Sequence, residues 1–276
     1  MIPFLLLVLV LLSNDLTRAA GISESSVRTP AGTEHLLVFV PEGPFTMGLD
    51  DGEKDESPAH VVYLDGFFLD KHEVTNSQYL AFISSRPTKL ALPDSVLLAF
   101  DDSDLQIRRT GKEYELKSTT EGRRPIVEVT WEGARAYCEW SGGRLPSEAE
   151  WEKGARGADG RSYPWGGGIS RERANYKGLF SQPVEVGHSQ DGASPYGALD
   201  MAGNVWEWVA DWYDSSYYGR APDRNPTGPA SGTFRTIKGG AWGTEAAFLR
   251  SSYRYGIAPD WSDDSIGFRC ARDSDP

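Results

Sequence analysis

Residues 203–212 (GNVWEWVADW) constrain the fold most, because they place three indole rings beside an amide, Asn204, and a carboxylate, Glu207. Buried carboxylates are uncommon unless they are ion-paired, hydrogen-bonded or bound to a cation. Asn204, Glu207 and nearby backbone carbonyls are hard oxygen ligands of the kind that calcium prefers. Hydrogen bonds from backbone or indole N–H groups to Glu207 explain the pattern equally well. The spacing therefore leaves both interpretations open.

The composition indicates a loop-rich chain. It contains 30 glycines, 17 prolines and 12% aromatic residues among 276 residues, and aromatic rings bury large apolar areas even where helices and strands are short. The net charge of −12 argues against nucleic acid or an anionic membrane as the main partner. Because no repeat or linker separates two cores, we expect a single α+β domain with little regular secondary structure.

The N-terminus has the pattern of a signal peptide, which we assign to residues 1–20. Residues 4–12 form an apolar core that is short for a bilayer span. Ala19, Ala20 and Gly21 then supply the small residues of a cleavage site. A buried N-terminal strand is the alternative. The pattern predicts an exported chain, periplasmic or secreted, with no stable membrane span after cleavage.

The two cysteines, Cys138 and Cys270, form an even pair in a chain predicted to enter an oxidising compartment. This favours a disulfide between them. In the chain-entropy model, closing a loop of about 130 residues contributes roughly 4–5 kcal/mol, less any strain. Two separately buried thiols are the alternative.

Strand signals are short and interrupted. We expect a flexible lead-in over residues 21–35, because this stretch is polar and aperiodic. Residues 36–45 and 60–69 are rich in β-branched and aromatic residues and predict strands, the first broken by prolines. Residues 109–112 have the composition of a hairpin turn.

Three helices are marked by N-terminal caps. Thr75 and Ser147 are each followed three residues later by Gln or Glu, which is the spacing of a capping box. Thr130 precedes an amphipathic segment over residues 131–140, which ends before a Gly-Gly pair. Cys138 is expected on the inner face of that helix.

Nine segments, in order, resemble motifs of the formylglycine-generating enzyme family, also called sulfatase-modifying factors. They span about residues 38–272 and include GPFTMG at 43–48, RLPSEAEWE at 144–152, GNVWEW at 203–208, KGGAW at 238–242 and GFRC at 267–270. The resemblance implies a C-type-lectin-like α+β fold over residues 36–274, low in regular secondary structure and often stabilised by calcium. It also supports the pairing of Cys138 with Cys270.

The resemblance favours calcium as the partner of Glu207. In the family, side-chain oxygens and carbonyls around this run hold the ion, and the matching positions here are Gly203, Asn204, Val205 and Glu207. A second family site begins at a stretch matched by Asn175 and Tyr176, but the acidic loop that follows it in the family has no counterpart. We therefore expect one structural calcium ion.

Oxidase members of the family bind copper through two cysteines that follow the segment matched by residues 239–242. Here the first position falls on Thr244 and the second on Phe248 or Leu249. Neither a hydroxyl nor an apolar side chain replaces a soft thiolate, and both cysteines are assigned to the disulfide. We expect no copper and no copper–thiolate oxidase chemistry.

The same segment supplies the remaining catalytic candidates: Glu245, Arg250, Tyr253 and Arg254. Glu245 could act as a base and the arginines could orient an anionic ligand. The alternative is a solvated loop with an arginine packed on aromatic rings. Structural roles explain the other acidic candidates, namely helix-start positions for Glu148, Glu150 and Glu152, and a buried hydrogen bond for Glu73.

Three functions follow from these patterns. The favoured one is an exported, calcium-stabilised domain that binds a peptide, protein or small ligand in its groove. The second is a divergent oxidoreductase or modifying enzyme that acts on an exported peptide-like substrate. Formylglycine generation itself is disfavoured because the thiolate pair is missing. The resemblance alone does not decide among them, since one fold can carry many sites.

Overall fold

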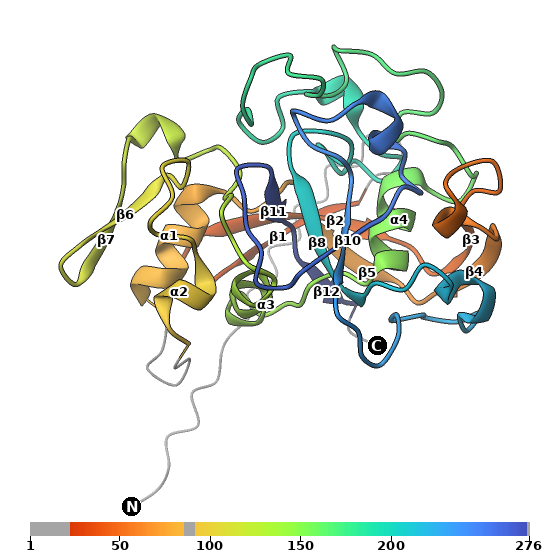
Figure 1. Ribbon diagram of the computed structural model, residues 1–276, viewed down its shortest axis with the longest axis horizontal. Helices are drawn as coiled ribbons and strands as arrows, with labels where there is room; N and C mark the ends of the chain where they lie inside the picture. Colours follow the sequence, from red (N-terminus) through yellow and green to blue (C-terminus); the bar gives the residue numbers. More distant parts are fainter. Residues whose placement is uncertain (1–22, 86–91, 275–276) are drawn as a thin grey trace, which may run out of the picture.

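Two four-stranded sheets form the centre of the computed structural model, which describes residues 23–85 and 92–274 (Figure 1). The predicted signal peptide lies outside the described residues. One antiparallel sheet has the order β1 (Glu24–Arg28), β2 (Glu34–Val40), β5 (Phe67–Asp70) and β12 (Ala271–Asp273). The other has the order β10 (Tyr255–Ile257), β9 (Arg235–Lys238), β8 (Trp206–Trp212) and β11 (Ile266–Phe268), with β11 parallel to β8.

The described residues also form two hairpins and four short helices, which lie around the sheets (Figure 1). The hairpins are β3 (Gly43–Met47) with β4 (His60–Leu64), and β6 (Ile107–Thr110) with β7 (Glu113–Leu116). The helices are α1 (Asn76–Ser85), α2 (Asp94–Leu97), α3 (Trp131–Trp140) and α4 (Glu148–Arg156). Short 3₁₀ turns occur at Lys54–Glu56, Thr119–Glu121, Gln190–Gly192, Tyr217–Arg220 and Ala246–Leu249. The architecture is the expected α+β domain with much irregular structure.

The first strand corrects the prediction of a flexible lead-in over residues 21–35. β1 pairs antiparallel with β2 along its whole length, and the hydroxyls of Thr29 and Thr33 hydrogen-bond across the connecting turn at 2.6 Å. β1 lies at an edge of its sheet. Backbone hydrogen bonds to β2 hold it there, so its sequence needs little alternation of apolar and polar residues. That explains why its sequence resembles a loop.

The two predicted strand segments each divide into two strands. β2 ends immediately before Pro41, as predicted, and β3 resumes at Gly43. The prediction of one strand over residues 60–69 is wrong, because Asp65 and Gly66 separate β4 from β5. A Cβ at Gly66 would lie 3.0 Å from the ring of Phe39, so a side chain in this turn would require that ring to shift. The hairpin at residues 109–112 is confirmed.

The predicted helix caps are confirmed by hydrogen bonds. The Oγ atoms of Thr75, Thr130 and Ser147 accept the backbone N–H three residues later, at 3.3, 3.1 and 3.2 Å. Each bond satisfies a donor that the first helical turn cannot pair internally. No helix in the described part of the chain is long and apolar enough to cross a bilayer.

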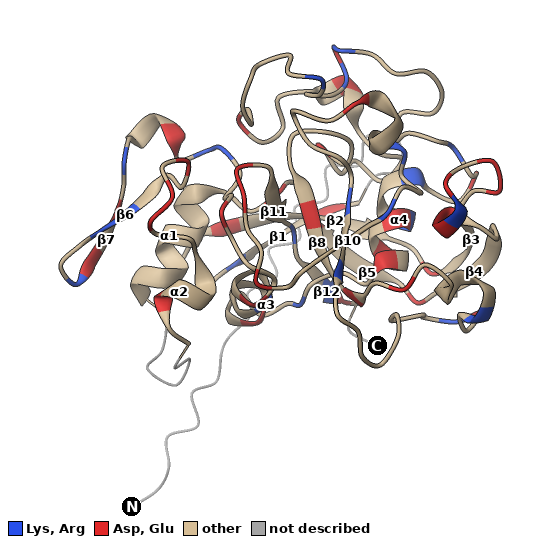
Figure 2. Cartoon of the chain, in the orientation of Figure 1, with Lys and Arg blue, Asp and Glu red and all other residues tan. Residues whose placement is uncertain are grey.

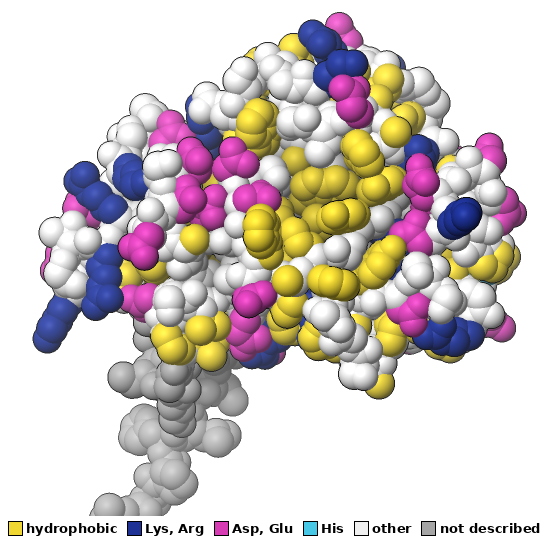
Figure 3. All heavy atoms as spheres, viewed as in Figure 1, with side chains coloured by type: hydrophobic (Ala, Val, Ile, Leu, Met, Phe, Trp, Pro, Cys, Tyr) yellow, Lys and Arg dark blue, Asp and Glu magenta, His cyan; other side chains and the backbone are white. Residues whose placement is uncertain are grey.

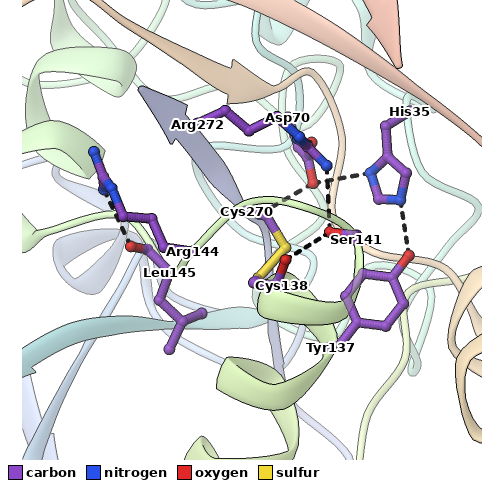
Figure 4. The surroundings of a disulfide bond; sticks show 9 residues. All are labelled: His35, Asp70, Tyr137, Cys138, Ser141, Arg144, Leu145, Cys270 and Arg272. Atoms are coloured by element: carbon purple, nitrogen blue, oxygen red, sulfur yellow. Dashed lines mark hydrogen bonds and ion pairs between the residues drawn. A yellow bond between two sulfur atoms is a disulfide. The ribbon is translucent and has the colours of Figure 1, made fainter. Parts of the chain in front are cut away.

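A disulfide between Cys138 and Cys270 joins α3 to the residues between β11 and β12 (Figure 4). Beside it, the carboxylate of Asp70 accepts hydrogen bonds from His35 at 3.1 Å, from Arg272 at 2.8 Å and from the Cys270 N–H at 3.1 Å. Burial raises the pKa of Asp70, but His35 and Arg272 outweigh this and hold it well below its usual range. The disulfide and the ionised Asp70 together fix α3 against the first sheet.

Candidate functional site

The tryptophan-rich run forms the start of β8, and Glu207 is buried there. Arg269 donates to both carboxylate oxygens, from Nε and Nη2, each at 2.7 Å. The indole Nε1–H of Trp151 donates to the same carboxylate at 2.8 Å. Bidentate guanidinium–carboxylate pairs are among the strongest hydrogen-bonded contacts in proteins. Protein donors therefore satisfy Glu207, as the hydrogen-bonding alternative proposed.

Asn204 links this run to two other segments. Its Oδ1 accepts a backbone N–H at 2.8 Å and its Nδ2 donates to Glu73 at 2.7 Å. The second oxygen of Glu73 accepts the Val205 N–H at 3.3 Å. Gly203 has φ of +81°, and a Cβ there would lie 2.3 Å from the carbonyl oxygen of Asn175. Glu73 thus has the structural hydrogen-bonding role that the sequence predicted.

Buried carboxylates outnumber the positive charge around Arg269. Glu73, Asp200 and Glu207 interact electrostatically with one another and with this guanidinium. Burial, followed by the charges of Asp200 and Glu207, raises the pKa of Glu73 well above its usual range. Burial likewise raises the pKa of Asp200 to about 6. A bound proton or a cation would compensate such surplus negative charge.

The predicted calcium ligands are only partly available. The side-chain oxygens of Asn204 and Glu207 already accept protein hydrogen bonds. At the second predicted site, the Tyr176 carbonyl accepts a backbone N–H at 3.1 Å, whereas Asn175 Oδ1 is buried without a hydrogen-bond partner. No three Cys, His, Asp or Glu side chains among residues 23–85 and 92–274 converge on one metal position. The surplus charge, rather than a ready-made ligand set, is what would favour calcium here.

Arg254, one of the catalytic candidates, is buried inside the protein. Its guanidinium forms two hydrogen bonds of 2.7 Å with the carboxylate of Glu148. It also lies over the rings of Tyr213 and Tyr218, at 5.0 and 4.4 Å from their centroids. This is the arginine packed on aromatic rings that the sequence offered as the alternative to an anion-orienting residue.

Arg250 and Glu245 have separate partners. Arg250 pairs with the buried carboxylate of Glu56 at 2.5 Å, and Ser252 donates to the same carboxylate at 2.6 Å. Glu245 forms a solvent-exposed ion pair with Lys177 at 3.0 Å. The structure does not combine them into a base with an adjacent anion clamp.

The helix-start role predicted for Glu148 is confirmed but incomplete, and Glu152 lies beyond the first turn of α4. Glu150 closes the capping box, whereas Glu148 and Glu152 belong to a buried ion network between α4 and β9. Figure 2 shows acidic positions on α4. Glu152 accepts from Arg156 at 2.9 Å and from Lys238 at 3.2 Å. The Glu152–Arg156 spacing of four residues also fits an exposed helix pair, so this pattern does not indicate burial.

The positions that correspond to the copper cysteines contain no thiolate. Thr244 Oγ1 closes a turn with the backbone of Ala241, at 3.0 Å from its nitrogen and 2.9 Å from its oxygen. Leu249 is buried, and Phe248 packs edge-on against Tyr253 with centroids 5.0 Å apart. Both cysteines of the chain are in the disulfide. A copper–thiolate centre therefore does not fit these residues.

An apolar band covers β8 and β10, and acidic side chains lie on both sides of it (Figure 3). We define the aromatic face as Trp206, Phe248, Tyr253 and Tyr255, which are joined by ring contacts and a shared cavity. Tyr253 and Tyr255 line a cavity of about 510 Å³, whose charged lining residues are Glu53, Asp55, Lys54 and Arg254. Burial and then Asp55 raise the pKa of Tyr253 to about 12, so its phenol is neutral at physiological pH. The face thus combines aromatic rings with a cavity of balanced charge, and further acidic side chains lie on both sides of the band.

The fold and the site place the chain in the C-type-lectin-like class. Its structure superposes on PvdO from Pseudomonas aeruginosa with a TM-score of 0.71 and 29% identity, covering 90% of this chain and 98% of that one. A family model, the sulfatase-modifying factor enzyme 1-like domain, matches residues 23–274. The chain belongs to this family, the sulfatase-modifying factors.

Two relatives show how the domain is used in other proteins. The formylglycine-generating enzyme of Streptomyces coelicolor is 34% identical, covering 86% of this chain and 89% of that enzyme. The serine/threonine-protein kinase Pkn1 of Chlamydia trachomatis is 39% identical over 86% of this chain, but the match covers only 38% of the kinase. The chain thus spans less than half the length of this kinase relative.

Proposed function

We propose that this chain is a ligand-binding member of the family, which holds a peptide or a segment of another protein on its aromatic face. The observation that carries the proposal is the juxtaposition of Tyr253 and Tyr255 with Glu53 and Asp55 around one open cavity. Aromatic anchors dominate the energetics of many protein interfaces. The family's copper–thiolate chemistry has no ligands here, and the candidate arginines are engaged in internal ion pairs.

The chemistry of the face favours a ligand with apolar and basic side chains. Aromatic rings bind cations over their faces as well as apolar groups against them. Carboxylates beside the rings add long-range attraction, which weakens with salt. A small cationic ligand is the alternative occupant, and it would use the same cavity.

Selection from a random peptide library, followed by titration of the best peptide, tests the proposal. We expect the Tyr253→Ser/Tyr255→Ser variant to weaken binding at least about ten-fold, which is the loss expected for aromatic anchors. Val61→Ser is the matched control, because Val61 is an apolar residue on β4 with 62% exposure. Equal loss in both variants, or no enrichment of basic and apolar peptides, would overturn the proposal.

An enzymatic function is the second candidate, favoured by the 34% identity to a formylglycine-generating enzyme over most of both chains. In that case Glu245, Arg250 and Tyr253 would serve an exported peptide-like substrate without thiolates. Aerobic incubation with cysteine-containing peptides, followed by mass spectrometry, separates the two functions. A modified peptide supports the enzyme, and an unmodified but bound peptide supports the binding domain.

We further propose that the chain is exported and stabilised by calcium. The disulfide supports an oxidising compartment, and the surplus of carboxylates around Arg269 supports a cation. Detection of a mature N-terminus near Gly21 in the periplasm or the medium tests the first part. A full-length chain confined to the cytoplasm contradicts it.

A further inference from the structure

A second cavity, of about 600 Å³, lies away from the aromatic face, where the ends of β8, β9 and β12 meet the start of α3. Its size is typical of small-molecule sites. Much of its wall is apolar, including Leu64, Phe67, Trp131, Leu145 and Pro226. A smaller cavity of about 380 Å³ shares Trp131 and Arg235 with it.

Arg235 is held rigidly between these two cavities. Its guanidinium carbon lies 3.6 Å from the ring centroid of Trp131 and 3.5 Å from that of Trp212. Stacking on both sides fixes the planar group, so little conformational freedom is left to lose when a ligand binds. One N–H group donates to the carbonyl of Ala210 at 2.6 Å.

Arg235 also has no ion-pair partner among the residues that the structure describes. Among residues 23–85 and 92–274, no carboxylate forms an ion pair with it, and its buried Nε lacks an acceptor. Burial lowers the pKa of Arg235 to about 10, although the nearby charges of Asp211 and Glu132 act in the opposite direction. Its guanidinium therefore retains donors for an additional acceptor.

The other charged side chains of the wall have partners of opposite charge. Arg144 pairs with Glu150 and Asp273, each at 2.6 Å. The remaining pairs are Arg135 with Glu132 and Asp65 with Arg224. The lining carries three basic and three acidic side chains and is neutral as a whole, and Arg235 is its one charged side chain without an ion pair among the described residues.

We propose that this cavity binds a small monocarboxylic acid with an aromatic or branched apolar body, whose carboxylate pairs with Arg235. Guanidinium and carboxylate geometries match, and the pair is strengthened in a site with limited water. A doubly charged phosphate fits less well, because Arg235 is the one unpaired lining cation and because Glu150 and Asp273 would repel two negative charges more strongly than one. The site is independent of the aromatic face and of the function proposed there.

Benzoate and benzamide, which have similar shape but different charge, test the site on the unmodified full-length chain. Calorimetric titration at low salt should give at least about ten-fold tighter binding of benzoate. The indole N–H signals of Trp131 and Trp212 should shift on binding, because both rings flank Arg235. Equal affinity for the two probes, or binding that leaves both indole signals unmoved, would overturn the proposal.

Two variants and a control complete the test. Arg235→Gln should reduce the preference for benzoate to about two-fold or less. Because this change could also disturb the tryptophan packing, Thr227→Trp is the second variant. It fills the cavity from an exposed position and leaves Arg235 in place. Arg135→Gln, which removes a lining cation that is already ion-paired, should keep the preference. Benzoate binding that survives Thr227→Trp contradicts the assignment.

Discussion

At the scale of single residues, the ion pair between Arg254 and Glu148 is expected to have the largest effect on stability. Both side chains are almost completely buried, and Lys238 lies 3.8 Å from the same carboxylate. Removing one partner of a buried pair leaves the other charge without its compensation in a low-dielectric environment, which is far more costly than losing an exposed pair. Arg254 is therefore a structural residue in this account.

We predict that Arg254→Gln lowers the free energy of unfolding by about 3–5 kcal/mol, the usual cost of breaking a buried pair. Glu245→Gln is the matched comparison, since it breaks the exposed pair with Lys177, and its effect should be much smaller. Urea unfolding followed by tryptophan fluorescence measures both. Similar small effects in the two variants would show that Arg254 is not part of the stabilising network.

Sequence patterns identified residues of the candidate site but did not predict which residues they contact. Glu73 and Glu207 were singled out because carboxylates stand beside aromatic segments, and both are buried. Their partner Arg269 comes from a segment 62 residues beyond Glu207, and no local pattern predicts such a pair. The same limit applies to Glu56, which pairs with Arg250 across 194 residues.

At the scale of elements, the loop that precedes α3 contains an unusual carboxyl group. Glu128 is buried, has φ of +57° and accepts a hydrogen bond from Ser262 at 3.0 Å. The Glu128 N–H donates to the carbonyl oxygen of Asp263 at 3.1 Å, which joins this loop to the one before β11. Burial raises the pKa of Glu128 to about 7, and nearby aspartates add to the rise.

This raised pKa predicts a pH-dependent loss of stability. Below about pH 4.5 the carboxyl is protonated in both states, so it has no effect. Between about pH 4.5 and 7 the unfolded chain ionises while the folded protein retains the proton, so folding becomes progressively less favourable. We expect Glu128→Gln to stabilise the fold by about 1–2 kcal/mol at pH 8 and by almost nothing at pH 4. Denaturant titration at the two pH values checks this, and an equal effect at both would exclude titration of Glu128 as the cause.

Helices were predicted more accurately than strands. Caps at Thr75, Thr130 and Ser147 are local chemistry, so a few adjacent residues suffice to place a helix start. Strand pairing depends on partners that are distant in the sequence. For this reason the local pattern predicted a flexible lead-in instead of β1, and one strand instead of β4 and β5. The pairing of β8 with β11 joins residues about 60 positions apart and had no local signal.

At the scale of the whole molecule, one disulfide and several buried charge networks take the place of long helices and strands. The disulfide ties residues separated by 132 positions. The Glu207–Arg269 pair connects β8 to the segment after β11, and the Glu152–Lys238 pair connects α4 to β9. A loop-rich chain is thus held by a few long-range links at its centre.

We predict that a bound calcium ion adds one more long-range link between distant segments of the chain. If a cation compensates Glu73, Asp200 and Glu207, chelation with EDTA should lower the melting temperature by several degrees, because an ion bound only to the folded state stabilises it. Added calcium, but not added sodium at equal ionic strength, should restore the original value. An unchanged melting temperature after chelation would show that a proton, rather than calcium, compensates the surplus charge.

The central claim is that this chain has the fold of the family and binds its ligand on the aromatic face, without a copper–thiolate centre. Titration with Cu(I) in the presence of a competing chelator tests it most directly, since it requires no knowledge of the substrate. A Thr244→Cys/Phe248→Cys variant, which restores thiols at two of the corresponding positions, is the positive comparison. We predict that the unmodified protein takes up no stoichiometric copper while the variant gains affinity. One tightly bound Cu(I) per unmodified chain would contradict the account.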